Sequence, residues 1–188
     1  MSNRNVLVVL SGPSGVGKGT IAKKLIERNK NLTLSISCTT RAPRDGEIDG
    51  REYFFINKNE FDKRVENDGF LEYSEHFENC YGTPKDFVLE KLESSDVLLE
   101  IDVNGGLNVK KSYKDAVLIM LLPPSLEEVK NRLVKRNTEP LEKIELRMSR
   151  IEYELSKKEL YDYLVVNDDL TVAIKQVEDI INKEKSKN

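Results

Sequence analysis

The feature that most constrains the fold of this chain is a glycine-rich stretch near its amino terminus, Gly12-Pro13-Ser14-Gly15-Val16-Gly17-Lys18-Gly19-Thr20. An apolar run over residues 6–10 precedes it. An apolar stripe at helical spacing follows it, made of Ile21, Ala22, Leu25 and Ile26. A strand, a glycine-rich loop and a helix in this order predict a phosphate-binding loop, in which backbone N–H groups and the lysine face phosphate oxygens. We therefore expect a nucleoside triphosphate site; the alternative is a tight turn between strand and helix.

The loop departs from the usual pattern at the residue after its lysine. That position normally holds Ser or Thr, whose hydroxyl reaches Mg²⁺. In this chain Gly19 stands there, and the hydroxyl comes one residue later, at Thr20. We expect Mg²⁺ to accompany the triphosphate and Thr20 to lie near it, either as a ligand or by ordering water and phosphate.

Composition and charge exclude several classes of function. The 188 residues are 34% charged and 38% hydrophobic with a net charge of −3, and the basic residues are scattered among acidic ones. This balance predicts one globular domain without a nucleic-acid surface. The amino terminus has neither a long apolar run nor a cleavage pattern, so we expect a cytoplasmic protein without membrane contact, either monomeric or weakly dimeric. Cys38 and Cys80 are isolated in the sequence and are expected to be reduced.

Apolar runs over residues 6–10, 97–101, 117–122 and 164–166 predict buried parallel strands. Helical patterns separate these runs, and the last helix follows a cap at Asp168 or Asp169. The alternation predicts an α/β fold: a three-layer core around a parallel sheet. We expect one domain over residues 4–184, with its core formed by residues 4–34, 96–124 and 150–184.

Two stretches interrupt the alternation. Residues 35–95 are rich in aromatic side chains and turn signals and predict an inserted α+β lobe. Residues 125–149 begin with the capping box Ser125 and Glu128, and they predict two basic helices around the segment 137–140. A basic helical hairpin beside a triphosphate site is typical of a lid; the alternative is a solvated charged face.

Six motifs in a fixed order give the chain a family resemblance. Besides the phosphate-binding loop, they are Ser37-Cys38-Thr39-Thr40-Arg41-Ala42-Pro43-Arg44-Asp45-Gly46-Glu47, Asp49-Gly50-Arg51-Glu52-Tyr53-Phe54-Phe55, Phe70-Leu71-Glu72-Tyr73 with Tyr81-Gly82-Thr83-Pro84, Glu100-Ile101-Asp102-Val103-Asn104-Gly105, and Val165-Val166-Asn167-Asp168. Over about residues 6–181 the chain closely resembles guanylate kinase. The resemblance implies ATP and GMP as substrates, a GMP-binding lobe at residues 35–95 and a lid at residues 125–149.

The chemistry of the lobe residues agrees with this resemblance. Two arginines can hold a phosphate dianion bidentately and two tyrosines can donate to it. By resemblance, Arg41, Arg44, Tyr53 and Tyr81 hold the GMP phosphate. Guanine presents two adjacent donors, N1–H and N2–H₂, which the carboxylate of Glu72 can accept, while adenine presents an acceptor at N1. By resemblance, Ser37, Glu72 and Thr83 recognise guanine.

The remaining site residues are assigned by resemblance. Asp102 ends an apolar strand and is expected to hold GMP or water around the metal. Glu100 is also placed with GMP, although many relatives have aspartate there; its alternative role is to pair with a neighbouring arginine. Arg132, Arg136 and Arg147 match the lid arginines that stabilise the transferring phosphoryl group, and Lys18 completes this catalytic set. Asn137 stands where relatives commonly have glycine. Asn167 and Asp168 are placed near the donor adenine, or else cap a helix.

The sequence therefore predicts an ATP:GMP phosphotransferase of purine nucleotide metabolism that forms ADP and GDP with Mg²⁺ and also accepts dGMP. Two alternatives remain. One is an inactive guanylate-kinase-like module that binds proteins, and the other is a kinase for another nucleoside monophosphate.

Overall fold

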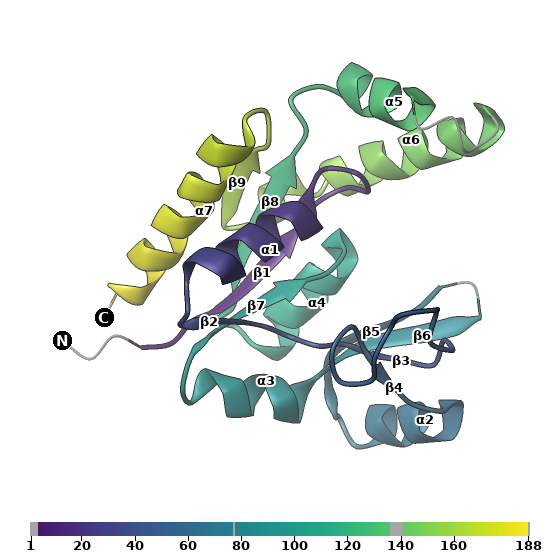
Figure 1. Ribbon diagram of the computed structural model, residues 1–188, viewed down its shortest axis with the longest axis vertical. Helices are drawn as coiled ribbons and strands as arrows, with labels where there is room; N and C mark the ends of the chain where they lie inside the picture. The colour runs from purple at the N-terminus through teal and green to yellow at the C-terminus, as the bar shows by residue number, and fades with distance from the viewer. Residues whose placement is uncertain (1–3, 77, 136–140, 188) are drawn as a thin grey trace.

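The computed structural model describes residues 4–76, 78–135 and 141–187. Its core is a five-stranded sheet in the order β2-β7-β1-β8-β9, with every neighbouring pair parallel (Figure 1). The strands are β1 (Leu7–Ser11), β2 (Leu32–Leu34), β7 (Asp96–Glu100), β8 (Val117–Leu122) and β9 (Tyr163–Val166). The four predicted strands are confirmed to within one residue at either end. β2 is a short edge strand that the apolar runs do not indicate.

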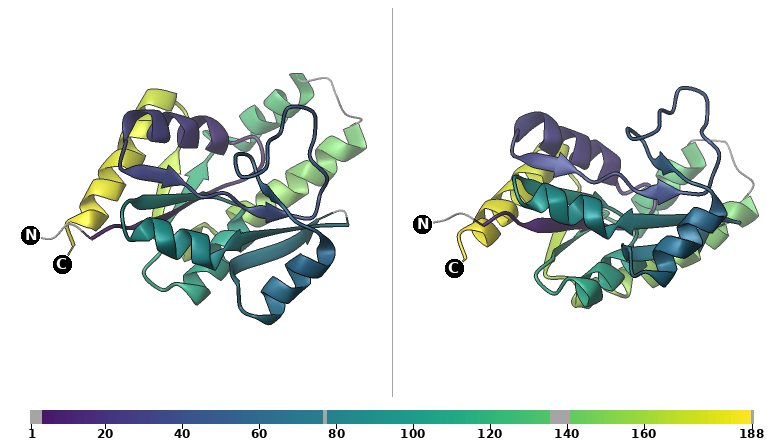
Figure 2. Two further views of the ribbon diagram at one scale, coloured as in Figure 1. Left: turned by 60° about the horizontal axis from the view of Figure 1, so that its bottom comes forward. Right: turned by 90° about the horizontal axis from the view of Figure 1, so that it is seen from below.

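Helices cover both faces of this sheet, as Figure 2 shows. On β1, Val8 and Leu10 face α1 (Lys18–Arg28) and α7 (Leu170–Lys185). Leu7 and Val9 face the opposite layer, which contains α3 (Lys85–Leu92) and α4 (Val103–Ser112). Because both faces of the strand are buried, its sequence is continuously apolar rather than alternating. The predicted three-layer α/β core is confirmed.

The inserted lobe has a sheet of its own, in the order β4-β3-β6-β5. Its elements are β3 (Cys38–Thr39), β4 (Phe54–Phe55), α2 (Lys58–Glu66), β5 (Phe70–His76) and β6 (Asn79–Pro84). A small core of Cys38, Phe61, Phe70 and Cys80 stabilises it, and both cysteines are free thiols. α3 follows β6 directly and buries Val88 against the main sheet, which connects the lobe to the core.

The predicted helical hairpin is formed by α5 (Leu126–Lys135) and α6 (Leu141–Leu155), and a 3₁₀ turn (Lys158–Leu160) leads from it to β9. Ser125 caps α5 as expected, since the backbone N–H of Glu128 donates to Ser125 Oγ at 3.1 Å. The two helices bury Val129 and Ile151 against each other. Asn137 lies outside the described residues. Across the described ranges, no helix has both the length and the apolar composition needed to cross a membrane.

Candidate active site

The phosphate-binding loop joins β1 to α1, and two of its glycines are required by its geometry. Gly12 has a φ of 149°, and a Cβ there would lie 2.5 Å from the carbonyl oxygen of Leu121. Gly17 has a φ of 102°, and a Cβ there would lie 2.6 Å from Nδ2 of Asn167. Side chains at these positions would therefore force the loop open. The glycines let it wrap around the first turn of α1, whose N–H groups have no partner within the helix.

Lys18 is the first residue of α1, and its side chain folds back into the loop. Its Nζ donates to the carbonyl oxygens of Gly12, at 2.6 Å, and Pro13, at 3.3 Å. Burial lowers the pKa of Lys18, because a desolvated ammonium is less stable than a neutral amine. The ammonium is thus held inside the loop, at the position where the motif predicts phosphate oxygens.

Three carboxylates near Lys18 oppose the lowering of its pKa: Glu100, Glu154 and Asp102. Glu100 lies beside the loop, since a Cβ on Gly19 would be 3.3 Å from its Oε1. Among the described residues, the cation whose charge acts on Glu100 is Lys18; an arginine partner for Glu100 stays a prediction. The missing side chain at Gly19 therefore leaves room for a carboxylate near Lys18.

Asn167 connects the end of β9 to the phosphate-binding loop. Its side chain is buried, and Nδ2 donates to the carbonyl oxygen of Val16 at 2.8 Å. The N-cap of α7 is Asp169, two residues after Asn167. Its side chain accepts hydrogen bonds from the N–H groups of Thr171 and Val172. Asn167 is thus a loop contact rather than a helix cap, and Asp168 between them is exposed.

A cavity of about 160 Å³ lies between the lobe and the carboxyl edge of the core sheet. Strands from both sheets supply its walls. Six of the nine residues predicted to bind GMP line it, together with Ser74 and Ile101, which the motifs did not single out: Ser37, Tyr53, Glu72, Tyr81, Glu100 and Asp102. The fold thus brings together side chains that are up to 65 positions apart, counted from residue 37 to residue 102.

Glu72 is the buried acid of this cavity. Its Oε1 accepts a hydrogen bond of 2.6 Å from the hydroxyl of Thr83, and its Oε2 faces Gly105 at the start of α4. The pKa of Glu72 is raised to about 7: burial is the largest cause, the hydrogen bond from Thr83 opposes the rise, and the Asp102 charge adds to it. The sequence predicted a charged acceptor here. With a pKa of about 7, both the charged and the protonated forms of Glu72 are present near neutral pH, and its role as a charged acceptor stays a prediction.

The two predicted phosphate arginines lie in the loop between β3 and β4. Arg41 lies 5.5 Å above the Tyr53 ring, and the Tyr81 hydroxyl also interacts with its guanidinium. Arg41 pairs with Glu47 through two hydrogen bonds of 2.9 and 3.0 Å. Arg44 is exposed in the same loop. Three of the four predicted phosphate ligands are therefore in contact, and Glu47 is a partner that the motifs gave no role.

The lid arginines are only partly placed. Arg132 lies in α5 and Arg147 in α6, with side chains that are not described, and Arg136 lies outside the described residues. On α6 the structure adds Glu154, whose Oε2 is buried and accepts no hydrogen bond from the described residues. Its Oε1 lies 3.4 Å from Nε of Arg150. Glu154 follows Arg147 by seven residues, two turns along one helix face, but this spacing alone does not indicate a buried acid.

The oxygen donors present fit a magnesium ion that is shared with phosphates. Among the described residues no three His, Cys, Asp or Glu side chains form a metal cluster. Mg²⁺ usually takes one or two carboxylates and completes its shell with water and substrate phosphates. The Glu100 carboxylate beside Gly19, the nearby Asp102 and the exposed Thr20 in the first turn of α1 meet that requirement.

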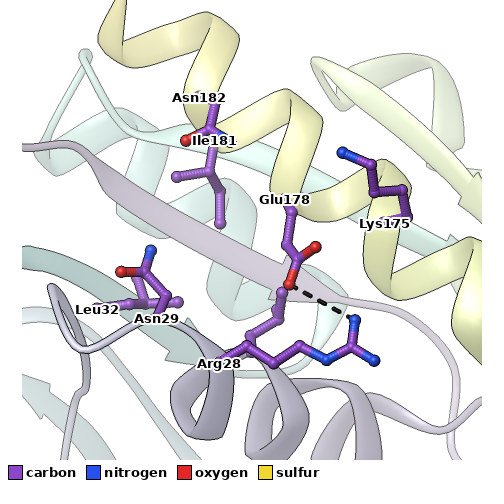
Figure 3. Close-up of a pocket in the computed structure, with 8 residues that line it drawn as sticks. Arg28, Asn29, Leu32, Lys175, Glu178, Ile181 and Asn182 are labelled. Carbon is purple, nitrogen blue, oxygen red and sulfur yellow. Dashed lines mark ion pairs between the residues drawn. The ribbon is translucent and has the colours of Figure 1, made fainter.

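A second hollow, of about 280 Å³, lies between α1 and α7 (Figure 3). The ion pair between Arg28 and Glu178 joins the two helices across it at 3.7 Å. Arg28 ends α1 and Leu32 begins β2, so this hollow is at the amino edge of the sheet, opposite the phosphate-binding loop. None of its lining residues belongs to the predicted site.

Comparisons with known proteins agree with this geometry. A family model described as guanylate kinase matches residues 4–184. The chain is 49% identical to a guanylate kinase of Caldanaerobacter subterraneus, over 98% of this chain and 90% of that protein, and 48% identical to one of Clostridioides difficile with the same coverage. It also resembles the crystal structure of a guanylate kinase from Anaplasma phagocytophilum, with a TM-score of 0.80 and 31% identity over all of this chain and 90% of that one. The fold is shared with a shikimate kinase from Bacteroides thetaiotaomicron. The two chains are 16% identical with a TM-score of 0.53, over 94% of this chain and 98% of that one.

Proposed function

Because this chain belongs to the guanylate kinase family, we propose that its phosphate-binding loop and its lobe cavity are the donor and acceptor halves of one site. The chain is an ATP:GMP phosphotransferase. The assignment of residues rests mainly on one observation: the same carboxylates belong to both the donor half and the acceptor half of the site. Glu100 and Asp102 act on Lys18 in the loop and also line the cavity that contains Glu72. Donor and acceptor phosphates would therefore meet at the carboxyl edge of the sheet, where α/β proteins bind their ligands.

The donor half would hold the ATP phosphates by backbone N–H groups of residues 12–20 and by the ammonium of Lys18. Lys18 would exchange its two loop carbonyls for phosphate oxygens, which are stronger acceptors because they carry charge. Asn167 would keep the loop closed through Val16. Mg²⁺, held by the phosphates together with Thr20, Glu100 and Asp102, would neutralise charge on the phosphates when bound.

The acceptor half would position GMP. Ionised Glu72, oriented by Thr83, would accept from N1–H and N2–H₂ of guanine, and Ser37 would complete recognition of the base edge. Arg41, Arg44, Tyr53 and Tyr81 would hold the phosphate. That phosphate already presents an anionic oxygen as nucleophile, so no general base is required. The bond from this oxygen to the γ-phosphorus of ATP forms as the bond from the γ-phosphorus to the β-phosphate oxygen breaks.

Closing of the lid would complete the site. Arg132, Arg136 and Arg147 would contribute positive charge to the equatorial oxygens of the moving phosphoryl group, and the closed lobes would exclude water that could otherwise hydrolyse ATP. dGMP is also an expected acceptor, because none of the assigned contacts uses the ribose 2′-hydroxyl. Assembly as a monomer or weak dimer remains a prediction, which sedimentation would check.

The test of this function follows a label in the γ-phosphoryl group of ATP. With MgATP and GMP, the label should appear in GDP and not in inorganic phosphate, and no transfer should occur without GMP. Label released only as inorganic phosphate would indicate an ATPase. A folded protein that binds GMP without transferring label would instead favour the protein-binding module.

A further inference from the structure

The loop between β3 and β4 contains an acid with no role in the proposed reaction, Glu47. The Glu47 carboxylate accepts from Nη2 of Arg41 through Oε1 and from Nη1 through Oε2. Only 14% of the Arg41 side chain and 18% of the Glu47 side chain are exposed. Bidentate arginine–carboxylate pairs of this kind fix the plane of the guanidinium as well as its position.

The same carboxylate also fixes the backbone that carries Arg44. Oε2 of Glu47 accepts from the backbone N–H of Arg44 at 2.8 Å, and the backbone N–H of Glu47 donates to the Arg44 carbonyl at 3.0 Å. These bonds close a turn that contains Gly46, with φ 84°. One acid therefore organises both arginines that are proposed to hold the GMP phosphate.

The donors that Arg41 retains have the right geometry for a phosphate. A guanidinium has five N–H groups. The Ala42 carbonyl takes the second hydrogen of Nη1, so Glu47 and Ala42 together use three of the five. The remaining two, on Nε and Nη2, are parallel and lie on the same edge of the guanidinium plane. Two other assigned phosphate ligands contact the same guanidinium: the Tyr81 hydroxyl hydrogen-bonds it, and the Tyr53 ring lies 5.5 Å from it.

We propose that Glu47 is a positioning residue for the acceptor phosphate: by occupying the Nη1–Nη2 edge of Arg41, it presents the Nε–Nη2 edge to GMP. The inference rests on the proposed function of this lobe. Glu47 has two opposite effects on GMP binding: it orients the Arg41 guanidinium, and its negative charge repels the phosphate dianion. The guanidinium lies between the two anions, however, and attracts both, so the orienting effect dominates. Preorganisation of this kind removes the cost of ordering a long side chain during binding.

The test compares Glu47→Gln with a matched variant in the same loop, Glu52→Gln. Glu52 makes the same kinds of contact, with an arginine side chain (Arg51 Nε, 2.6 Å) and a backbone N–H (Ile48, 2.8 Å), but its arginine is not assigned to the phosphate. Binding of GMP and of guanosine, which lacks the phosphate, would be measured by calorimetry, with KM values for both substrates and melting temperatures.

Glu47→Gln should weaken GMP binding about tenfold and raise KM for GMP equally. Guanosine binding, KM for ATP and kcat should stay within about twofold of the parent, as should every value for Glu52→Gln. Glu47→Asp keeps the charge and should lose less GMP affinity than Glu47→Gln. This variant provides the comparison with the parent if the glutamine variant does not fold.

Three results would overturn the inference while leaving the proposed function in place. Tighter GMP binding by Glu47→Gln would show that the acid competes with the phosphate. Equal losses of affinity for GMP and for guanosine would show that it supports the lobe in general. GMP binding equal to that of the parent would show that it has no positioning role. A parent that neither binds nor phosphorylates GMP would overturn the proposed function and this inference together.

Discussion

The proposed donor and acceptor halves of this site are built in different ways. The donor half is a continuous segment, residues 12–20, whose shape depends on backbone angles at glycine and on one lysine. The acceptor half is a cavity formed by individual side chains from residue 37 to residue 102. A backbone-built site binds phosphate whatever nucleoside is attached to it, whereas a side-chain-built site can distinguish one base from another. Substitutions in the two halves should therefore affect different kinetic constants.

The largest expected effect is on the donor side. Lys18→Ala removes the one side-chain cation of the loop, and kcat should fall about 10³-fold, because this charge acts on the transferring phosphoryl group. GMP binding should be unchanged. Lys24→Ala, an exposed lysine on the same helix, is the control and should remain fully active. Steady-state kinetics with a melting curve for each variant make the measurement, and near-normal turnover of Lys18→Ala would refute the donor assignment.

On the acceptor side, Glu72→Gln should reduce kcat/KM for GMP about 10²-fold, because the amide replaces one acceptor oxygen with an NH₂ donor that faces a guanine N–H. KM for ATP should stay near the parent value. Glu75→Gln, on the same strand with its side chain exposed, is the matched control. If Glu72→Gln impaired ATP and GMP equally, the two halves would not be separable in the way described here.

Acid should weaken GMP binding specifically. Glu72 must be ionised to accept from guanine, and its pKa in this structure is about 7. Below that pH the dissociation constant for GMP should rise, approaching tenfold per pH unit. The phosphate of GMP also titrates, near pH 6, but it does so equally in Glu72→Gln. Calorimetry of both proteins at several pH values therefore isolates Glu72, and parallel profiles would contradict the assignment.

The raised pKa of Glu72 also determines how the stability of the folded protein changes with pH. The folded protein binds the Glu72 proton more tightly than the unfolded chain, whose glutamate has a pKa near 4.5. The resulting stabilisation is fully present below that value and is lost as the pH rises through about 7. The melting temperature of the parent relative to Glu72→Gln should therefore decrease between pH 5 and pH 8.

The smallest expected effect concerns support of the donor loop. Asn167→Ala removes the hydrogen bond to the Val16 carbonyl and should raise KM for ATP about fivefold, with KM for GMP unchanged. The exposed Asn182 provides the control substitution to alanine. Should both substrates be affected alike, Asn167 would support the fold in general rather than the loop.

The sequence predicted the donor half of the site better than the acceptor half. The phosphate-binding loop is local, so its glycines and lysine predicted its position between a strand and a helix. The core strands were predicted because burial on both faces makes them continuously apolar. β2 was missed because it has three residues, of which only Leu32 is buried, and so gives no such signal. Glu47 was read only as part of a motif, and Glu154 had no role, because a pairing of side chains depends on tertiary contacts that spacing alone does not specify.

The raised pKa of Glu72 could not be predicted from the sequence either, because it too depends on tertiary contacts. A carboxylate that recognises guanine was predicted from the chemistry of the base. Its pKa depends on burial between β5, Thr83 and the start of α4, which only the folded structure provides.

The most direct test of the central claim, that a backbone-built donor loop serves an acceptor cavity specific for guanine, is ADP formation from MgATP with GMP, dGMP, AMP, CMP and UMP offered separately. Rapid ADP formation with GMP and dGMP alone is predicted, because only guanine offers Glu72 two adjacent donors. Comparable rates with AMP, CMP or UMP would contradict the claim, since the cavity would then not select its base through Glu72.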